Sequence, residues 1–307
     1  MDWLTAEEAS RLAVVVSDEL SDELCAALGA VRPADLPLDP VAPFVCLGPS
    51  LPEDLRDDPR LRWFHSSNAG VDALLGQGPW PEDVLLTRTV GRMGERIAQY
   101  VLGWMLAESQ SIPAFLKQTR ERVWRRQPTE LLVGGLAVVY GVGGIGAEIG
   151  GLLRRCGVYT VGVAGTPRPV AGFDRVVAAA DAPLPQARWV VSALPLTDAT
   201  RDFFDAARFG RFAGATFVNV GRGATVDLGA LESALLDGRV RSAVLDVLPG
   251  EPPAPDAVCW RLPRTVITSH TSGVTEDSDV VADFTACLHE LRAGELPRLT
   301  VHTERGY

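Results

Sequence analysis

A glycine-rich turn between an apolar run and a helical pattern constrains this chain more than any other feature. The turn comprises residues 141–146 (Gly-Val-Gly-Gly-Ile-Gly) and follows the continuous apolar run 135–140. Such a run is expected of a strand buried on both faces of a parallel sheet, and residues 147–155 have the apolar spacing of a helix. A strand, glycine turn and helix in this order predict a dinucleotide-binding site, with pyrophosphate at the helix N-terminus. The alternative is a plain turn whose glycines serve packing alone.

Each glycine has a separate task in this interpretation. Gly141 allows the tight turn, Gly143 lets pyrophosphate approach the backbone, and Gly146 lets the helix pack closely on the strand. We expect Gly144 and Ile145, between them, to contribute further contacts to the cofactor.

Composition bounds the class of protein. A length of 307 residues suggests two domains, and 47% apolar residues suffice for two cores. The net charge of -10 disfavours a nucleic-acid partner. The chain has no uninterrupted apolar stretch long enough to span a membrane, and its acidic N-terminus is unlike a signal peptide. The five cysteines form no C-x-x-C pair. We therefore expect a cytoplasmic protein with no metal site.

The chain pattern predicts two α/β domains. From residue 135 onward, apolar strand patterns alternate with helical ones, as in a doubly wound parallel sheet. Residues 1–90 read as a smaller α/β unit, and a final helical segment over about 276–293 is expected to return to it. The predicted fold is α/β, with two Rossmann-like doubly wound parallel-sheet domains. The smaller, discontinuous substrate domain would comprise 1–93 and 274–307, and the dinucleotide-binding domain 94–273.

A long helix is expected over 95–125, with Pro113 kinking or interrupting it. It carries more apolar positions than one domain would cover. We therefore predict a homodimer formed through this helix. Trp124 could reach an active site in its own or a partner subunit, or lie in the core.

Three residues after the glycine turn suggest chemistry on a small acid. Arg222 could hold a carboxylate and polarise a carbonyl, and His270 could protonate the developing alkoxide. Glu251 would keep His270 protonated and oriented, because a neighbouring carboxylate favours imidazolium. Two of them have simpler interpretations. Arg222 could only cap a loop, and Glu251 could lie in an exposed turn. Among the four histidines, His65 is the one rival to His270.

The order of the motifs resembles the D-isomer-specific 2-hydroxyacid dehydrogenase family over nearly the whole chain, most closely its glyoxylate/hydroxypyruvate reductase branch. The similar segments are the turn 69–72, the glycine turn 141–146, residues 192–200 (Ser-Ala-Leu-Pro-Leu-Thr-Asp-Ala-Thr), 219–227 (Asn-Val-Gly-Arg-Gly-Ala-Thr-Val-Asp), 245–247, Glu251-Pro252 and His270. The resemblance implies an oxidoreductase that transfers hydride between a nicotinamide cofactor and a small 2-oxo or 2-hydroxy acid. Arg222, Glu251 and His270 would then be catalytic.

The resemblance also implies binding residues. The backbone of Ala69, Gly70 and Val71 would complete the substrate carboxylate site, beside Arg222 and His270. Further cofactor contacts would come from Leu194, Pro195, Thr200, Val220, Gly221, Asp246 and Ser272. Asp246 would contact the nicotinamide amide, although it could instead be a buried, hydrogen-bonded strand end.

The sequence departs from the family pattern at two places. Ser269 stands where proline usually precedes the histidine. After the strand that follows the glycine helix, no acidic residue appears before Asp174 to bind the ribose 2′-hydroxyl. Thr166 and Arg168 could accept a 2′-phosphate instead, because the arginine fork suits phosphate. The departure favours NADP(H) over NAD(H), unless Arg168 is simply a solvated charge.

Two other functions remain open at this point. One is a dehydrogenase of a larger 2-hydroxy acid, such as phosphoglycerate. The other is a nucleotide-sensing binding protein on the same fold that performs no turnover. The presence of Arg222, Glu251 and His270 together argues against the sensor, because a protein without turnover does not need all three. The fold alone does not decide between these functions.

Overall fold

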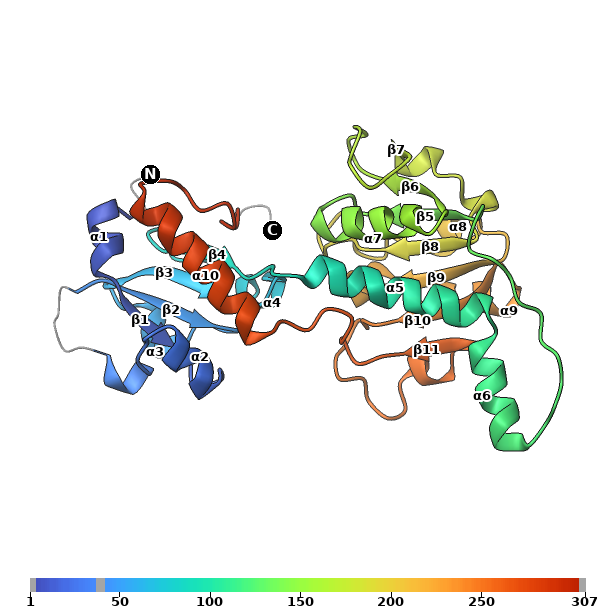
Figure 1. Ribbon diagram of the computed structural model, residues 1–307, viewed down its shortest axis with the longest axis horizontal. Helices are drawn as coiled ribbons and strands as arrows, with labels where there is room; N and C mark the ends of the chain where they lie inside the picture. Colours follow the sequence, from blue (N-terminus) through green and yellow to red (C-terminus); the bar gives the residue numbers. More distant parts are fainter. Residues whose placement is uncertain (1–3, 37–41, 304–307) are drawn as a thin grey trace. The chain divides into compact units, whose positions relative to one another are not determined.

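A computed structural model describes residues 4–36 and 42–303 of the chain (Figure 1). The chain divides into two compact units. One comprises Met1–Met93 together with Thr275–Tyr307, and the other comprises Gly94–Val274. Each unit is built on its own parallel sheet.

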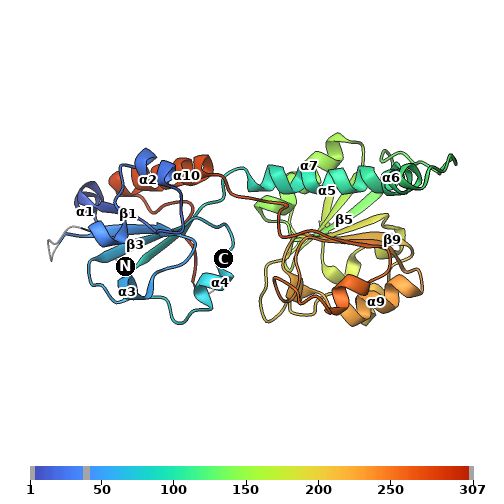
Figure 2. The ribbon, with the colours of Figure 1, turned by 90° about the horizontal axis from the view of Figure 1, so that it is seen from below.

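The first unit contains a four-stranded parallel sheet in the order β1-β2-β3-β4. Its helices cover both faces, with α1, α2 and α10 on one face and α3 and α4 on the other (Figure 2). Successive strand residues point to opposite faces, so the strands feed two cores. Val16, Val45 and Trp63 pack with α10, whereas Val15, Cys46 and Phe64 pack on the opposite face. The elements are α1 (Ala6–Arg11), β1 (Ala13–Val16), α2 (Asp22–Ala27), β2 (Phe44–Gly48), α3 (Glu53–Arg56), β3 (Leu61–Ser66), α4 (Asp72–Leu75), β4 (Leu85–Arg88) and α10 (Asp277–Arg292).

The second unit contains a seven-stranded parallel sheet in the order β11-β10-β9-β8-β5-β6-β7. The strand order reverses beside β5, and ligands of such sheets bind at the carboxyl ends of the strands near this point. Helices again cover both faces, with α5 and α7 opposite α9 (Figure 2). The elements are α5 (Met93–Ser109), α6 (Ile112–Glu121), β5 (Leu136–Tyr140), α7 (Gly144–Arg155), β6 (Tyr159–Val163), β7 (Arg175–Val177), β8 (Trp189–Ser192), α8 (Ala206–Phe209), β9 (Ala215–Asn219), α9 (Leu228–Leu236), β10 (Val240–Leu245) and β11 (Thr265–Ile267).

The predicted fold class is confirmed, since both sheets are parallel and covered by helices. One strand, β7, was not predicted. It has only three residues, Arg175–Val177, and none is fully buried. A strand so short and so exposed at a sheet edge leaves no apolar run to detect.

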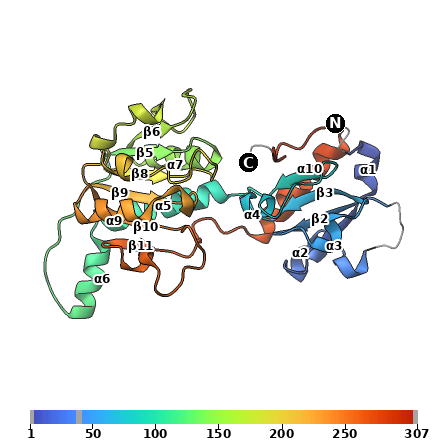
Figure 3. The same cartoon turned by 180° about the vertical axis from the view of Figure 1, so that it is seen from behind.

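The helix predicted over 95–125 is interrupted close to Pro113, as predicted, but its last predicted residues are not helical. Helix α5 ends at Ser109, and α6 runs only from Ile112 to Glu121. Ser111 breaks the helix because its backbone is left-handed, with φ of 53°. Pro113 lies in the first turn of α6, where the missing N–H costs little. Figures 1 and 3 show α6 projecting from the body of its unit, followed by an irregular segment that returns to β5.

Candidate active site

The glycine turn lies at the carboxyl end of β5 and opens α7. Gly141 has φ of +95°, and its N–H donates to the carbonyl of Val163 at 3.1 Å. A Cβ on Gly146 would lie 1.9 Å from the carbonyl oxygen of Gly141, so the helix meets the strand at a distance that only glycine permits. Gly143 and Gly144 face open space. Exposed N–H groups at the start of a helix suit a phosphate, and this cradle therefore fits a dinucleotide cofactor.

Helix α7 begins earlier than the sequence predicts. The sequence pattern placed its start at 147, whereas the structure caps the helix with Gly143 and starts it at Gly144. Glycine has low intrinsic helix propensity, which hid the first turn. As a result, Gly144, Ile145 and Gly146 form the helix N-terminus itself.

The loops after β8 and β9 pack against each other beside this turn. A Cβ on Gly221 would lie 2.5 Å from the carbonyl oxygen of Leu194, so the two backbones are in close contact. The Thr200 hydroxyl donates to the carbonyl of Pro195 and accepts from the N–H of Thr197, each at 2.7 Å. Val220 is buried at the end of β9. Thr200 therefore shapes the predicted cofactor loop through its own side chain.

Arg222 follows β9 on a turn that Asn219 organises. The Asn219 amide accepts from Gly221 N–H and donates to the carbonyl of Arg222, both at 3.1 Å. The Arg222 guanidinium donates to the carbonyl of Gly221 at 2.8 Å. A Cβ on Gly223 would lie 1.9 Å from the carbonyl carbon of Leu248. The turn carrying Arg222 is thus in backbone contact with the loop that carries Glu251.

Glu251 and His270 form a direct pair. Glu251 Oε1 accepts from the N–H of Leu248, and Oε2 lies 2.7 Å from His270 Nδ1. The histidine side chain is 52% exposed and the glutamate 35%. Because Nδ1 faces the carboxylate, Nε2 lies on the opposite side of the ring, where it could exchange a proton with a substrate. Residues 19 positions apart are therefore brought into an acid–base arrangement.

Asp246 anchors the turn that carries His270. Its side chain accepts from the Thr268 hydroxyl at 2.6 Å and from the N–H groups of Thr271 and Ser272 at 3.0 and 3.1 Å. Burial opposes ionisation of Asp246, but hydrogen bonds from Ser272, Thr268 and Thr271 outweigh it and hold the pKa of Asp246 below its usual range. Its backbone carbonyl also accepts from His270 N–H at 2.9 Å. The sequence missed Thr268, because a threonine after a short strand carries no motif.

The predicted substrate turn belongs to the other unit. Ala69, Gly70 and Val71 follow β3, and Val71 is buried in the core of the first unit. The Arg88 guanidinium donates to the carbonyl of Ala69 at 3.0 Å and supports this turn. Arg222, Glu251 and His270 all lie in the second unit.

The alternative that His65 rather than His270 is the catalytic histidine is wrong. His65 is fully buried, and its two ring nitrogens lie 2.7 and 3.0 Å from the hydroxyls of Thr87 and Thr89. Burial lowers the pKa of His65 to about 3, which keeps the ring neutral. The ring also makes edge contacts with Trp63 and Phe284. His65 is therefore a structural residue of the first core.

The segment after β6 carries the residues considered for the 2′-phosphate. Thr166 and Arg168 are both exposed. Asp174 is occupied elsewhere, since its carboxylate pairs with Arg154 at 3.0 Å and accepts from Thr160 N–H at 2.7 Å. A cavity of about 550 Å³ is lined by residues 167–171 and 173–176.

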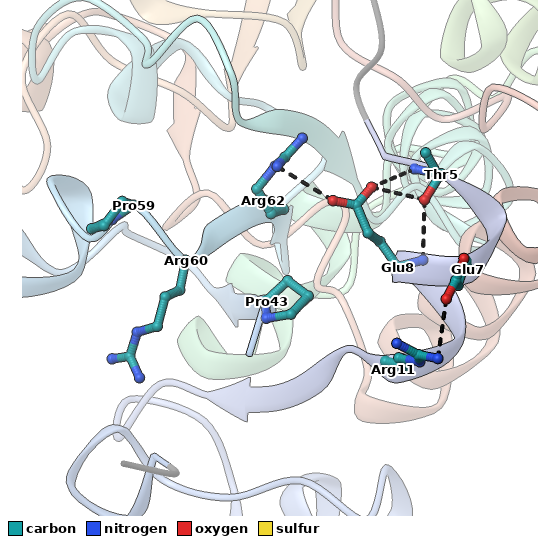
Figure 4. A pocket seen from close by; sticks show the side chains of 8 residues that line it. All are labelled: Thr5, Glu7, Glu8, Arg11, Pro43, Pro59, Arg60 and Arg62. Carbon is teal, nitrogen blue, oxygen red and sulfur yellow. Dashed lines mark hydrogen bonds and ion pairs between the residues drawn. The ribbon is translucent and has the colours of Figure 1, made fainter. Parts of the chain in front are cut away.

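A second cavity, of about 420 Å³, lies on the first unit (Figure 4). Charged side chains around it pair among themselves, Arg11 with Glu7 at 3.0 Å and Arg62 with Glu8 at 3.5 Å. Hydrogen bonds from Thr5 lower the pKa of Glu8. The cavity contains none of the predicted site residues.

Two further observations concern residues 4–36 and 42–303 only. Within these ranges, no three His, Cys, Asp or Glu side chains are grouped so that they could hold a metal ion. Likewise, none of the helices found there is both long and apolar enough to cross a membrane.

Known proteins are similar to this chain in sequence and in fold. A family model for the NAD binding domain of D-isomer specific 2-hydroxyacid dehydrogenases matches residues 102–272. An uncharacterized protein of Streptomyces coelicolor is 55% identical over 271 residues, 87% of this chain and 97% of that protein. Glyoxylate/hydroxypyruvate reductase A of Serratia proteamaculans is 27% identical over 268 residues, 83% of this chain and 84% of the reductase.

A crystal structure shows the same architecture. It is a D-isomer specific 2-hydroxyacid dehydrogenase from Xanthobacter autotrophicus in complex with NADPH and MES, with a TM-score of 0.85 and 28% identity. The similarity covers 97% of this chain and 100% of that one. By its sequence and its fold, the chain belongs to the D-isomer specific 2-hydroxyacid dehydrogenase family, whose members depend on NAD(P).

Proposed function

We propose that this protein reduces small 2-oxo acids, glyoxylate or hydroxypyruvate among them, to D-2-hydroxy acids with NADPH. The observation that carries the proposal is the 2.7 Å pair between His270 Nδ1 and Glu251, in a loop that contacts the turn of Arg222. The similarity to a glyoxylate/hydroxypyruvate reductase supports the substrate class.

Each residue has a defined task in this reaction. Arg222 binds the substrate carboxylate and polarises its carbonyl, because guanidinium donors match carboxylate geometry. Glu251 orients the imidazole and stabilises its charged form, and His270 donates the Nε2 proton to the developing alkoxide. When bound, the nicotinamide supplies the hydride, and the protein supplies alignment.

Preference for NADPH is proposed from the loop after β6. Arg168 and Arg175 both line its cavity. The nearby acid, Asp174, is held by Arg154 and Thr160, which leaves the loop cationic rather than acidic. A phosphate would be attracted to such a loop, whereas a ribose hydroxyl would find no carboxylate. The relative from Xanthobacter autotrophicus was crystallised with NADPH.

We therefore expect Arg168→Ala to raise the KM for NADPH about tenfold, the effect of losing one charge-assisted contact. The KM for NADH should stay unchanged, because NADH lacks the 2′-phosphate. Steady-state kinetics with both cofactors measures this, and equal effects on the two would contradict a role in phosphate recognition.

A homodimer is proposed from exposed apolar residues on α6 and the segment after it. Trp124 is 101% exposed in the single chain, so its placement in the core is wrong. Leu116, Leu131 and Val133 are 58%, 76% and 66% exposed. Large apolar groups gathered in one segment are typical of a protein interface. A cytoplasmic location stays a prediction of the sequence.

The deciding experiment follows NADPH and NADH oxidation with glyoxylate, hydroxypyruvate, phosphohydroxypyruvate and a bulkier 2-oxo acid. His270→Ala serves as the control for acid–base catalysis. Turnover of a small 2-oxo acid that His270→Ala reduces on the order of 100-fold or more would support the proposal. Cofactor binding without turnover of any of these acids would contradict it and favour a sensor.

A further inference from the structure

We propose that Tyr100 of α5 is a positioning residue for His270, acting through the hydroxyl of Thr268 and the carboxylate of Asp246. The proposal rests on the function assigned above to His270. These hydrogen bonds connect α5 to the turn that carries His270. The two segments are distant in sequence, since Tyr100 and Thr268 are 168 positions apart.

In this series of hydrogen bonds, Tyr100 donates to Thr268 and Thr268 donates to Asp246. Thr268 Oγ1 lies 2.7 Å from the Tyr100 hydroxyl and 2.6 Å from Asp246 Oδ1. The lowered pKa of Asp246 keeps it ionised, so it can only accept, and Thr268 must spend its single hydroxyl proton on it. Thr268 therefore accepts from Tyr100. Burial raises the pKa of Tyr100 to about 12, which keeps the phenol a donor at neutral pH.

The series of hydrogen bonds reaches the backbone on both sides of His270. Asp246 accepts from the N–H groups of Thr271 and Ser272, and its backbone carbonyl accepts from the N–H of His270 itself. Residues before and after the histidine are thereby tied to one buried carboxylate. Tyr100 connects that carboxylate, through Thr268, to α5.

The backbone at His270 needs such support. Its φ of 53° lies in the left-handed region, which is unfavourable for a residue that carries a side chain. Ser269 precedes it, so no proline ring stiffens the approach. Because the side chains of His270 and Glu251 are partly exposed, packing alone does not fix their contact. Hydrogen bonds to the turn therefore set the direction of the ring.

The test is Tyr100→Phe, which removes one hydroxyl and keeps the ring that packs at 6.3 Å against Trp104. We expect kcat to fall about tenfold with both KM values within about twofold, as for a catalytic group that is present but misplaced. Thr268→Val should reproduce the defect, Thr268→Ser should restore most activity, and the double variant Tyr100→Phe/Thr268→Val should add little.

A second readout does not depend on turnover. In protein labelled with ¹⁵N-histidine, we expect a proton on Nδ1 facing Glu251 to give a low-field resonance, which its loss in His270→Gln would identify. We expect this resonance to broaden or shift in Tyr100→Phe. If the unmodified protein turned over no 2-oxo acid, the proposed function would fail, and this measurement would still decide the role of Tyr100.

The matched control is Ser242→Ala. Ser242 donates to Glu108 at 2.8 Å, near the other end of α5, and so also ties this helix to the sheet. It should leave kcat and the resonance unchanged. Two results would overturn the inference: Tyr100→Phe behaving as the unmodified protein in both measurements, or Ser242→Ala showing the same defect.

Discussion

At the residue scale, the proposed chemistry depends on the charge of Glu251 as well as its position. Its carboxylate has one oxygen on the N–H of Leu248 and the other on His270 Nδ1. A glutamine could accept from only one of these N–H groups, because its amide has a single acceptor oxygen, and it would carry no charge to stabilise imidazolium. The substitution therefore removes the charge together with one hydrogen bond.

We expect Glu251→Gln to lower kcat/KM for reduction by about 10- to 100-fold, within the range that acid–base groups contribute. Steady-state kinetics with NADPH and a small 2-oxo acid measures this. An unchanged kcat/KM would show that the reaction does not need the charge of Glu251.

The unfolding free energy should depend on pH through His65, which lies outside the proposed active site. The pKa of His65 is about 3 in the folded protein, whereas an unfolded histidine titrates near 6.5. The unfolded chain therefore binds the proton first, so this contribution to stability is full above about pH 6.5 and declines as pH falls toward 3.

Between about pH 7 and pH 5 we expect the unmodified protein to lose about 1–2 kcal/mol more unfolding free energy than His65→Gln. Urea unfolding at the two pH values measures the difference. His289→Gln, which replaces an exposed histidine of α10, is the control and should follow the unmodified protein. An equal loss in His65→Gln would contradict the assignment.

At the element scale, the contact of α7 with β5 positions the cofactor cradle. The apolar run and the glycine spacing were enough to predict the strand, the turn and the helix. The start of α7 and the short strand β7 could not be predicted, because glycine and brief exposed segments carry little local signal. An interruption between α5 and α6 was predicted from Pro113, but its exact position at Ser111 was not, because serine carries no comparable signal.

Gly146→Ala tests the packing of α7 on β5. The added Cβ would meet the carbonyl oxygen of Gly141 at 1.9 Å, so the helix must move away. We expect a loss of about 1–3 kcal/mol in stability and a weakening of NADPH binding of about tenfold or more. Thermal unfolding and NADPH fluorescence titration measure these.

Gly151→Ala is the matched control on the same helix. Its Cβ would meet no atom closer than 3.7 Å, and alanine is the better helix former, so stability should rise by about 0.5–1 kcal/mol. NADPH affinity should not change. If the two variants bound NADPH equally well, close packing at Gly146 would not be what shapes the cradle.

At the scale of the whole molecule, the proposed homodimer would form through the exposed apolar residues of α6 and the segment after it. Leu131→Arg would place a charge in that surface. We expect the unmodified protein to have a solution mass near twice 32.9 kDa and the variant a mass near the single value. Light scattering after gel filtration measures both.

Leu236→Arg provides the comparison for this test. Leu236 is 71% exposed at the end of α9, close to the 76% of Leu131, but lies on another element. This variant should keep the mass of the unmodified protein. A dimer that survives Leu131→Arg would place the interface elsewhere.

The sequence by itself determined the fold class, most strands and the identity of Arg222, Glu251 and His270 as candidates, because these follow from local patterns and the order of motifs. Only the tertiary structure decided which groups meet. It brought Glu251 to His270, buried His65 among Thr87 and Thr89, and joined Tyr100 to Thr268. The physical reason is that hydrogen bonds and burial depend on distance in space, and these partners are 19 to 168 residues apart in the chain.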